Sequence, residues 1–119
     1  MRPPKTAFAL LLAAALLPAA PASAADGAKI FNLQCRTCHA AKSSVAGPSL
    51  TGVAGRKVAG LSDFGYSQAL KSKGGTWTDA ALDAYLTAPT KFAPGGRMIT
   101  AIAAPADRAA VIAYLKTLK

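Results

Sequence analysis

The chain has 119 residues, with 14 lysines and arginines against five acidic residues and a formal net charge of +9. This length allows one domain with a small core. The basic residues are scattered rather than grouped, which argues against a nucleic-acid-binding tail and leaves an acidic protein or an anionic lipid surface as the partner of a basic surface.

The first 24 residues predict a secretory signal peptide. Arg2 and Lys5 form a short positive region, residues 7–17 are an unbroken apolar run, and a small-x-small cleavage site ends at Ala24. An uncleaved membrane anchor is the alternative, but a membrane span needs about 20 apolar residues. We therefore expect cleavage after Ala24 and a periplasmic domain over residues 25–119, with no membrane span remaining.

Residues 26–38 predict an amphipathic helix. Gly27, Ile30 and Phe31 are spaced to share one face, and Asp26 stands where an N-cap residue is expected. A glycine inside the first turn costs helix stability, so we expect a close contact there.

The segment Cys35-Arg36-Thr37-Cys38-His39 is the Cys-x-x-Cys-His signature of covalent c-type haem attachment. The two thiols add across the haem vinyl groups and the imidazole binds the iron. Residues three and four apart share one face of a helical turn, so Cys35, Cys38 and His39 can meet one flat macrocycle. We therefore expect one covalently bound haem c, with His39 as an axial ligand.

Three other interpretations of this motif remain open. A structural zinc site needs four protein ligands and would have to recruit aspartates. A redox-active cysteine pair is expected beside a strand–helix–strand pattern, and no such pattern is evident. A plain disulfide between Cys35 and Cys38 would leave His39 without a role.

Residues 42–52 predict a loop. It contains Gly47-Pro48-Ser49-Leu50-Thr51-Gly52, which resembles the Gly-Pro-x-Leu-x-Gly of class I cytochromes c, the family of mitochondrial cytochrome c and bacterial cytochrome c2. The resemblance implies that the Pro48 carbonyl accepts a hydrogen bond from the ligand histidine and so fixes its ring. By itself, a Gly-Pro pair indicates only a turn.

Four further residues take expected roles from this resemblance. Gly55-Arg56-Lys57 resembles the family's Gly-Arg-Lys, which implies that Arg56 lies near a haem propionate. Tyr66 and Trp77 match a tyrosine and a tryptophan that hydrogen-bond a propionate. Tyr85 matches a tyrosine on the methionine side of the haem. For Tyr66 and Trp77, ordinary core packing is the alternative.

Two helices are predicted in this middle part of the chain. The first begins near Tyr66 and ends before Gly74-Gly75. The second covers residues 78–88, with Thr78 as its cap and Pro89 as its stop.

A second ligand-bearing segment is Pro94-Gly95-Gly96-Arg97-Met98, which resembles the family's Pro-Gly-x-Lys-Met. After cleavage the chain would contain one histidine and one methionine. With His39 on one face of the iron, Met98 is the only thioether available as the other axial ligand. Met/His ligation raises the reduction potential and suits electron transfer. The alternative is a methionine that fills a gap in the core.

Residues 104–118 predict the last helix, with Pro105 at its first position. The resemblance implies that this helix crosses the first one, with a glycine against aromatic rings. Gly27, Phe31 and Tyr114 fit that contact.

The resemblance covers residues 26–119, with departures at four positions. Gly96 stands where a threonine is common in mitochondrial-type members, and Leu70 stands where many have an asparagine. Thr100 and Ile102 replace a common phenylalanine and glycine. These changes affect the expected propionate hydrogen bonds and the potential, while the ligands stay the same.

The sequence thus predicts an all-α class I cytochrome c fold around one haem, in a monomer that is not an enzyme. The predicted function is to shuttle single electrons between redox proteins of a respiratory or photosynthetic chain. The alternatives are a cytochrome subunit of a periplasmic dehydrogenase or oxidase, and an open-site haem sensor or peroxidase-like protein. The basic side chains expected around the haem edge, where acidic surfaces of partners would dock, are Lys42, Lys57, Lys71, Lys73, Lys91 and Arg97.

Overall fold

The computed structural model describes residues 1–4, 9, 11–16 and 23–119. The apolar run predicted over residues 7–17 lies partly outside these ranges. Pro18 and Pro21, which follow that run in the sequence, lie outside them as well. Within the described ranges, no helix has the length and apolar character needed to cross a bilayer. The first described helix has its N-cap at Ser23, a residue of the predicted cleavage site.

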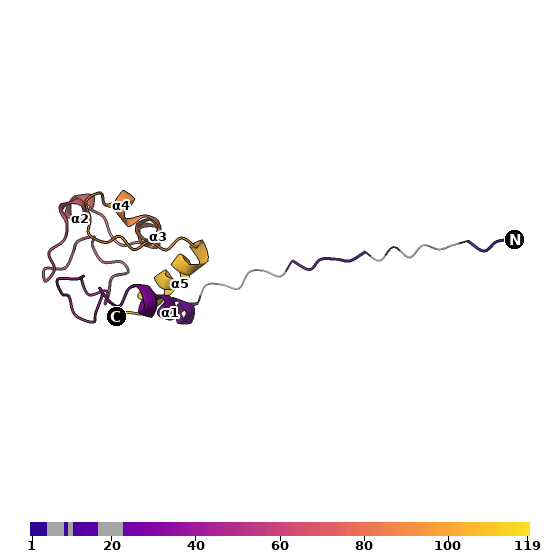
Figure 1. The fold of residues 1–119 in the computed structure, drawn as a ribbon, viewed down its shortest axis with the longest axis horizontal. Helices are drawn as coiled ribbons and strands as arrows, with labels where there is room; N and C mark the ends of the chain where they lie inside the picture. The colour runs from indigo at the N-terminus through magenta and orange to yellow at the C-terminus, as the bar shows by residue number, and fades with distance from the viewer. Residues whose placement is uncertain (5–8, 10, 17–22) are drawn as a thin grey trace.

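Five helices are described, and loops connect most of them (Figure 1). They are α1 (Ala24–Gln34), α2 (Gln68–Lys73), α3 (Asp79–Thr87), α4 (Pro89–Phe92) and α5 (Pro105–Leu115). Helices α1 and α5 pack on each other, and α3 contacts both α5 and α4. In Figure 1, α2 and α4 lie on the far side of α3 from α1. The described residues contain two isolated β-bridges and no strand, so the all-α prediction is confirmed.

Helix α1 differs from its prediction at both ends. Its N-cap is Ser23, whose hydroxyl accepts a hydrogen bond from the Asp26 amide at 3.2 Å, so Asp26 lies in the first turn instead. Serine and aspartate cap equally well, and the sequence pattern could not separate them. The helix ends at Gln34 because the amides of Cys35 and Arg36 both bond to the Phe31 carbonyl, which breaks the regular ladder.

The middle helices largely follow the predicted signals. Helix α2 begins at Gln68, two residues later than expected, because the Ser67 hydroxyl caps it. Gly74 ends it with a φ of 70°, a conformation that glycine adopts without strain. Thr78 caps α3 as predicted. Pro89 ends α3 but also occupies the first position of α4, a short helix that the sequence analysis did not predict.

The crossing of α1 and α5 is confirmed, and Gly27 lies at its closest point. A Cβ atom at Gly27 would lie 2.0 Å from the Ala110 carbonyl oxygen and 2.9 Å from the Tyr114 Cβ. Beside this contact, the rings of Phe31 and Tyr114 pack with centroids 5.1 Å apart. The glycine therefore lets the two backbones approach, at the expense of local helix stability.

The core joins α1, α3 and α5 to the loop that follows α1 and to the residues just before α3 and α5. Among the described residues, no charged or polar side chain is fully buried. The buried apolar side chains include Phe31, Val53, Val58, Trp77, Leu82, Leu86, Ile102, Val111, Ile112 and Leu115. Several of them also line a cavity, so the core is built around an internal space.

Candidate haem site

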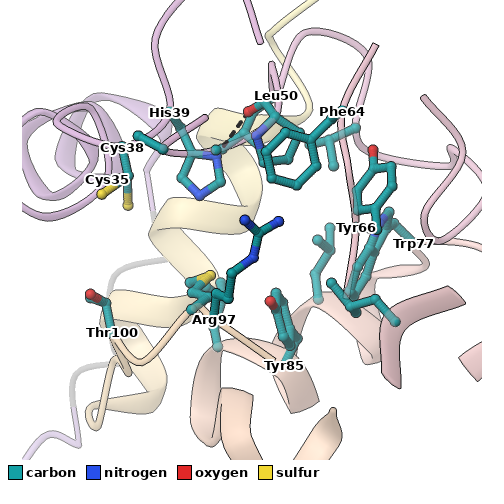
Figure 2. Close-up of a pocket in the computed structure, with 18 of the residues that line it drawn as sticks. Cys35, Cys38, His39, Leu50, Phe64, Tyr66, Trp77, Tyr85, Arg97 and Thr100 are labelled. Carbon is teal, nitrogen blue, oxygen red and sulfur yellow. Dashed lines mark hydrogen bonds between the residues drawn. The ribbon is translucent and has the colours of Figure 1, made fainter. Parts of the chain in front are cut away.

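The Cys-x-x-Cys-His segment forms a helical turn directly after α1. The amides of Cys38 and His39 both bond to the Cys35 carbonyl, at 3.1 and 2.9 Å. The three side chains therefore face the same cavity (Figure 2). Burial raises the pKa of the Cys35 thiol above its usual value.

The structure argues against the three other interpretations of this motif. Within residues 23–119, no three side chains of the metal-ligating types His, Cys, Asp and Glu cluster together, so zinc lacks ligands. The two cysteines are not joined in a disulfide. The described residues also lack the strands that a thioredoxin-like redox motif needs.

His39 is oriented by the loop that follows it. Its Nδ1 donates a hydrogen bond to the Pro48 carbonyl oxygen at 2.9 Å (Figure 2). Because a carbonyl only accepts, Nδ1 must carry the proton, which leaves Nε2 of the neutral ring with a free lone pair. This is the form of imidazole that binds a metal, and a bond of this kind fixes ring orientation.

Gly47 makes room for this histidine. A Cβ atom at Gly47 would lie 2.7 Å from the Cys38 carbonyl oxygen and 3.1 Å from His39 Nδ1. Any side chain here would therefore push against the ring of His39 or the backbone of Cys38. The sequence motif contained this glycine, but only the fold reveals what the glycine accommodates.

The cavity has a volume of about 340 Å³, within the range of small-molecule sites. Every site residue predicted from the sequence lines it: Cys35, Cys38, His39, Pro48, Arg56, Tyr66, Trp77, Tyr85 and Met98. Figure 2 shows His39 and Tyr85 on opposite sides of this space. Side chains separated by up to 63 positions in the chain thus converge on one largely apolar pocket.

Arg56 provides a test of whether haem fits. Its two terminal nitrogens donate to the carbonyls of Ser49 and Thr51, at 3.1 and 3.2 Å. Its Nε is buried and has no hydrogen-bond partner. A buried unpaired donor is costly, and a carboxylate at this wall of the cavity would satisfy it. The arrangement fits a haem propionate, although this role stays a prediction.

The aromatic residues form one wall. Trp77 is buried, and its ring packs against those of Tyr85 and Phe92, with centroids 5.1 and 5.6 Å away. The rings of Tyr85 and Phe92 also contact each other, with centroids 5.3 Å apart. Burial raises the pKa of the Tyr85 phenol, so it stays neutral as a possible hydrogen-bond donor. The Tyr66 hydroxyl accepts a bond from the Leu61 amide at 3.3 Å and keeps its proton available to a second partner. The expected propionate contacts of Tyr66 and Trp77 stay predictions.

Arg97 extends into the cavity, between His39 and Tyr85 (Figure 2). Its guanidinium donates to the Gly65 carbonyl and lies 5.2 Å from the centroid of the Phe64 ring. A macrocycle in this space requires the long, flexible side chain to turn outward. Arg97 is already exposed at the rim of the cavity, and that movement would carry its charge away from the cavity toward solvent.

The sequence analysis missed two aromatic contributors to this site. Phe64 lines the cavity from a glycine-containing loop without helical or strand periodicity, so no pattern marked it. Phe92 extends the aromatic wall from α4, the helix that was not predicted. Both reach the site only through the course of the chain in three dimensions.

Comparison with known proteins identifies the family. Residues 24–119 match the family model described as Cytochrome c. The chain is 45% identical over 97 residues to cytochrome c of Tetrahymena pyriformis, covering 80% of this chain and 88% of that one. It is 45% identical over 98 residues to cytochrome c2 iso-2 of Magnetospirillum fulvum, covering 79% of this chain and 100% of that one.

A solved structure agrees with these relatives. Cytochrome cH from Methylobacterium extorquens superposes with a TM-score of 0.74 at 40% identity, covering 80% of this chain and 98% of that one. Together with the spacing of Cys35 and Cys38, these matches identify the cofactor as a covalently bound haem c. The fold, the cavity and the relatives agree, and the chain belongs to the class I c-type cytochromes of the cytochrome c family.

Proposed function

We propose that this protein is an exported monohaem electron carrier that shuttles single electrons between redox proteins of a respiratory or photosynthetic chain. The observation that carries the proposal is the bond from His39 Nδ1 to the Pro48 carbonyl. It leaves Nε2 free in a cavity that Met98 also lines. When bound, the haem iron supplies the reversible one-electron chemistry.

The residues of the chain would hold and tune this group. Cys35 and Cys38 would anchor it covalently, and His39 and Met98 would occupy the two axial positions. Met/His ligation raises the reduction potential and leaves no position open for a substrate. The apolar lining keeps water from the iron, which further favours the less charged, reduced state.

The optical spectrum of the loaded, oxidised protein tests the ligand assignment. Methionine bound to ferric haem gives a weak near-red band in this family. We expect that band in the native protein and its loss in Met98→Ala. Lys119→Ala serves as the control because it alters an exposed terminal residue. A native protein without the band and with high-spin iron would contradict the carrier function and favour an open-site sensor or peroxidase-like protein.

The location of the protein is a separate part of the proposal. We expect export and cleavage of the first 24 residues, followed by residence in the periplasm. Cleavage after Ala24 would remove Ser23 and with it the side-chain cap of α1. The intact mass of the mature protein will show whether cleavage occurs there. A mature chain that retains residues 1–24 would contradict this part of the proposal.

The docking surface is also proposed from charge. The basic residues Lys42, Lys57, Lys71, Lys73, Lys91 and Arg97 are all exposed. An acidic partner would be steered toward such a surface, so its electron-transfer rate should fall as salt screens the charges. Stopped-flow reduction at increasing ionic strength tests this, and a rate independent of salt would refute it. Stable co-purification with a larger redox protein would instead indicate a subunit of an enzyme complex.

A further inference from the structure

Beyond the cavity, the structure holds an arginine that the sequence analysis left without a role. Arg108 lies in the first turns of α5, and only 11% of its side chain is exposed. Its Nη1 donates to the carbonyls of Ile102 and Ala103, at 3.0 and 2.8 Å. Its Nε donates to Asp83 of α3 at 2.7 Å. One guanidinium thus joins two helices to the segment between them.

The segment that Arg108 holds is the one that follows Met98. Ile102 is anchored a second time, because its side chain is buried and its amide bonds to the Leu86 carbonyl at 2.8 Å. Within the described chain, residues 98–101 make no hydrogen bond to another residue. Ile99 is 78% exposed, and Thr100 and Ala101 are exposed as well. Neither burial nor hydrogen bonding therefore fixes residues 99–101 directly, and their path depends on the anchor at Ile102 and Ala103.

We propose that Arg108 is a positioning residue for Met98. It holds the carbonyls of Ile102 and Ala103 and thereby fixes the end of residues 98–103, called here the Met98 segment. The inference rests on the proposed function, in which Met98 is an axial ligand. Loss of these two bonds would let the segment move away from the cavity, so the thioether would leave the iron more often. Arg108 then sets how firmly the sixth coordination position is closed.

A second arginine holds the loop beside the other predicted ligand, His39. There Arg56 donates to the carbonyls of Ser49 and Thr51, just after Pro48, the partner of His39. Each predicted ligand is therefore backed by an arginine that holds two carbonyls of the adjoining loop. The fork of a guanidinium can hold two carbonyls and a further partner in a fixed geometry, which a lysine ammonium cannot reproduce.

The chain offers a matched control for a merely structural role. Lys116, the residue that caps the C-terminal end of α5, pairs with Asp79 of α3 at 2.6 Å, so it links the same two helices as Arg108 and Asp83. Its side chain is 50% exposed and makes no bond to the Met98 segment. A general loosening of α5 against α3 should therefore follow from either substitution, whereas loosening of Met98 should follow only from loss of Arg108.

Imidazole binding to the loaded, oxidised protein tests the proposal, because imidazole can bind only when the sixth position opens. We expect Arg108→Gln to raise the apparent imidazole affinity about tenfold or more, equivalent to about 1.4 kcal/mol. The near-red band should also disappear at lower imidazole concentration. We expect Lys116→Gln to change the affinity less than about twofold. Asp83→Asn, which leaves the bonds from Arg108 to the carbonyls in place, should resemble Lys116→Gln.

Two results would overturn the proposal. One is an unchanged imidazole affinity in Arg108→Gln, and the other is an equal increase in Asp83→Asn or Lys116→Gln. Should Arg108→Gln fail to accumulate in loaded form, Arg108→Lys keeps a charge beside Asp83 without the fork, and the same increase is expected from it. Absence of the near-red band from the native protein would refute the ligand assignment itself, and so separates failure of the proposed function from failure of this inference.

Discussion

Substitution of Gly27 by alanine tests the packing that closes the fold. In an isolated helix this change would be favourable, since alanine stabilises a helix interior by about 1 kcal/mol relative to glycine. In this protein the new Cβ would lie 2.0 Å from the Ala110 carbonyl oxygen, whereas real Cβ contacts essentially never fall below 3.0 Å. Because both atoms belong to rigid backbone segments, α1 and α5 must separate by about 1 Å.

The expected cost follows from that separation. A gap of 0.5–1 Å forfeits about a quarter to a half of the dispersion attraction between facing atoms. The interface affected includes the contact of Phe31 with Tyr114. Overpacking of this severity costs about 3 kcal/mol, so the net loss after the gain in helix propensity is about 2 kcal/mol. For a domain of this size, that lowers Tm by roughly 8–16 °C.

Thermal and urea unfolding of the loaded protein, followed by circular dichroism, measures this loss. Gly65→Ala is the matched control, because a Cβ there meets nothing within 4 Å. We expect the free energy of unfolding of this control to be unchanged or raised by up to about 1 kcal/mol. If Gly27→Ala were as stable as the native protein, helix propensity would outweigh packing at this position, and the reasoning about close approach would be wrong.

Three further predictions concern the cavity. Gly47→Ala should lower the yield of loaded protein and weaken the near-red band, because the new Cβ would lie 2.7 Å from the Cys38 carbonyl oxygen and 3.1 Å from His39 Nδ1; an unchanged spectrum would contradict this role. Arg56→Gln should cost about 1.5–3 kcal/mol in urea unfolding through loss of charged hydrogen bonds, and no loss would show that solvent replaces them. Burial raises the pKa of Tyr85 in the folded protein. As pH rises, the Tyr85 phenol therefore ionises first in the unfolded chain. The stability that this phenol contributes is complete below about pH 10 and is lost above it. Tyr85→Phe should therefore reduce the fall in urea midpoint between about pH 9 and 11, and parallel curves for the two proteins would refute this.

The sequence predicted the capping and termination of several helices because these signals are local. Thr78 caps α3 and Gly74 ends α2 through contacts within a few residues of the chain. Where two local signals competed, the prediction was wrong: Ser23 rather than Asp26 caps α1. The start of α4 at Pro89 was missed because proline both ends one helix and opens another.

The sequence by itself determined the chemistry of this protein. Cys35, Cys38 and His39 lie within one helical turn, and their spacing predicted covalent haem attachment, with zinc, a redox pair and a disulfide as the alternatives. A single histidine and one methionine beyond Met1 also limit the possible axial ligands without any knowledge of the fold.

Only the tertiary structure decided how this chemistry is supported. It brought Phe64 and Phe92 to the cavity and its aromatic wall, placed Gly47 against the ring of His39, and aimed Arg108 at the carbonyls that follow Met98. These contacts join residues that lack a shared periodicity, and Arg108 meets backbone atoms, which every residue type carries. Sequence patterns identify side-chain types at fixed spacings, whereas such contacts exist only once the helices have packed.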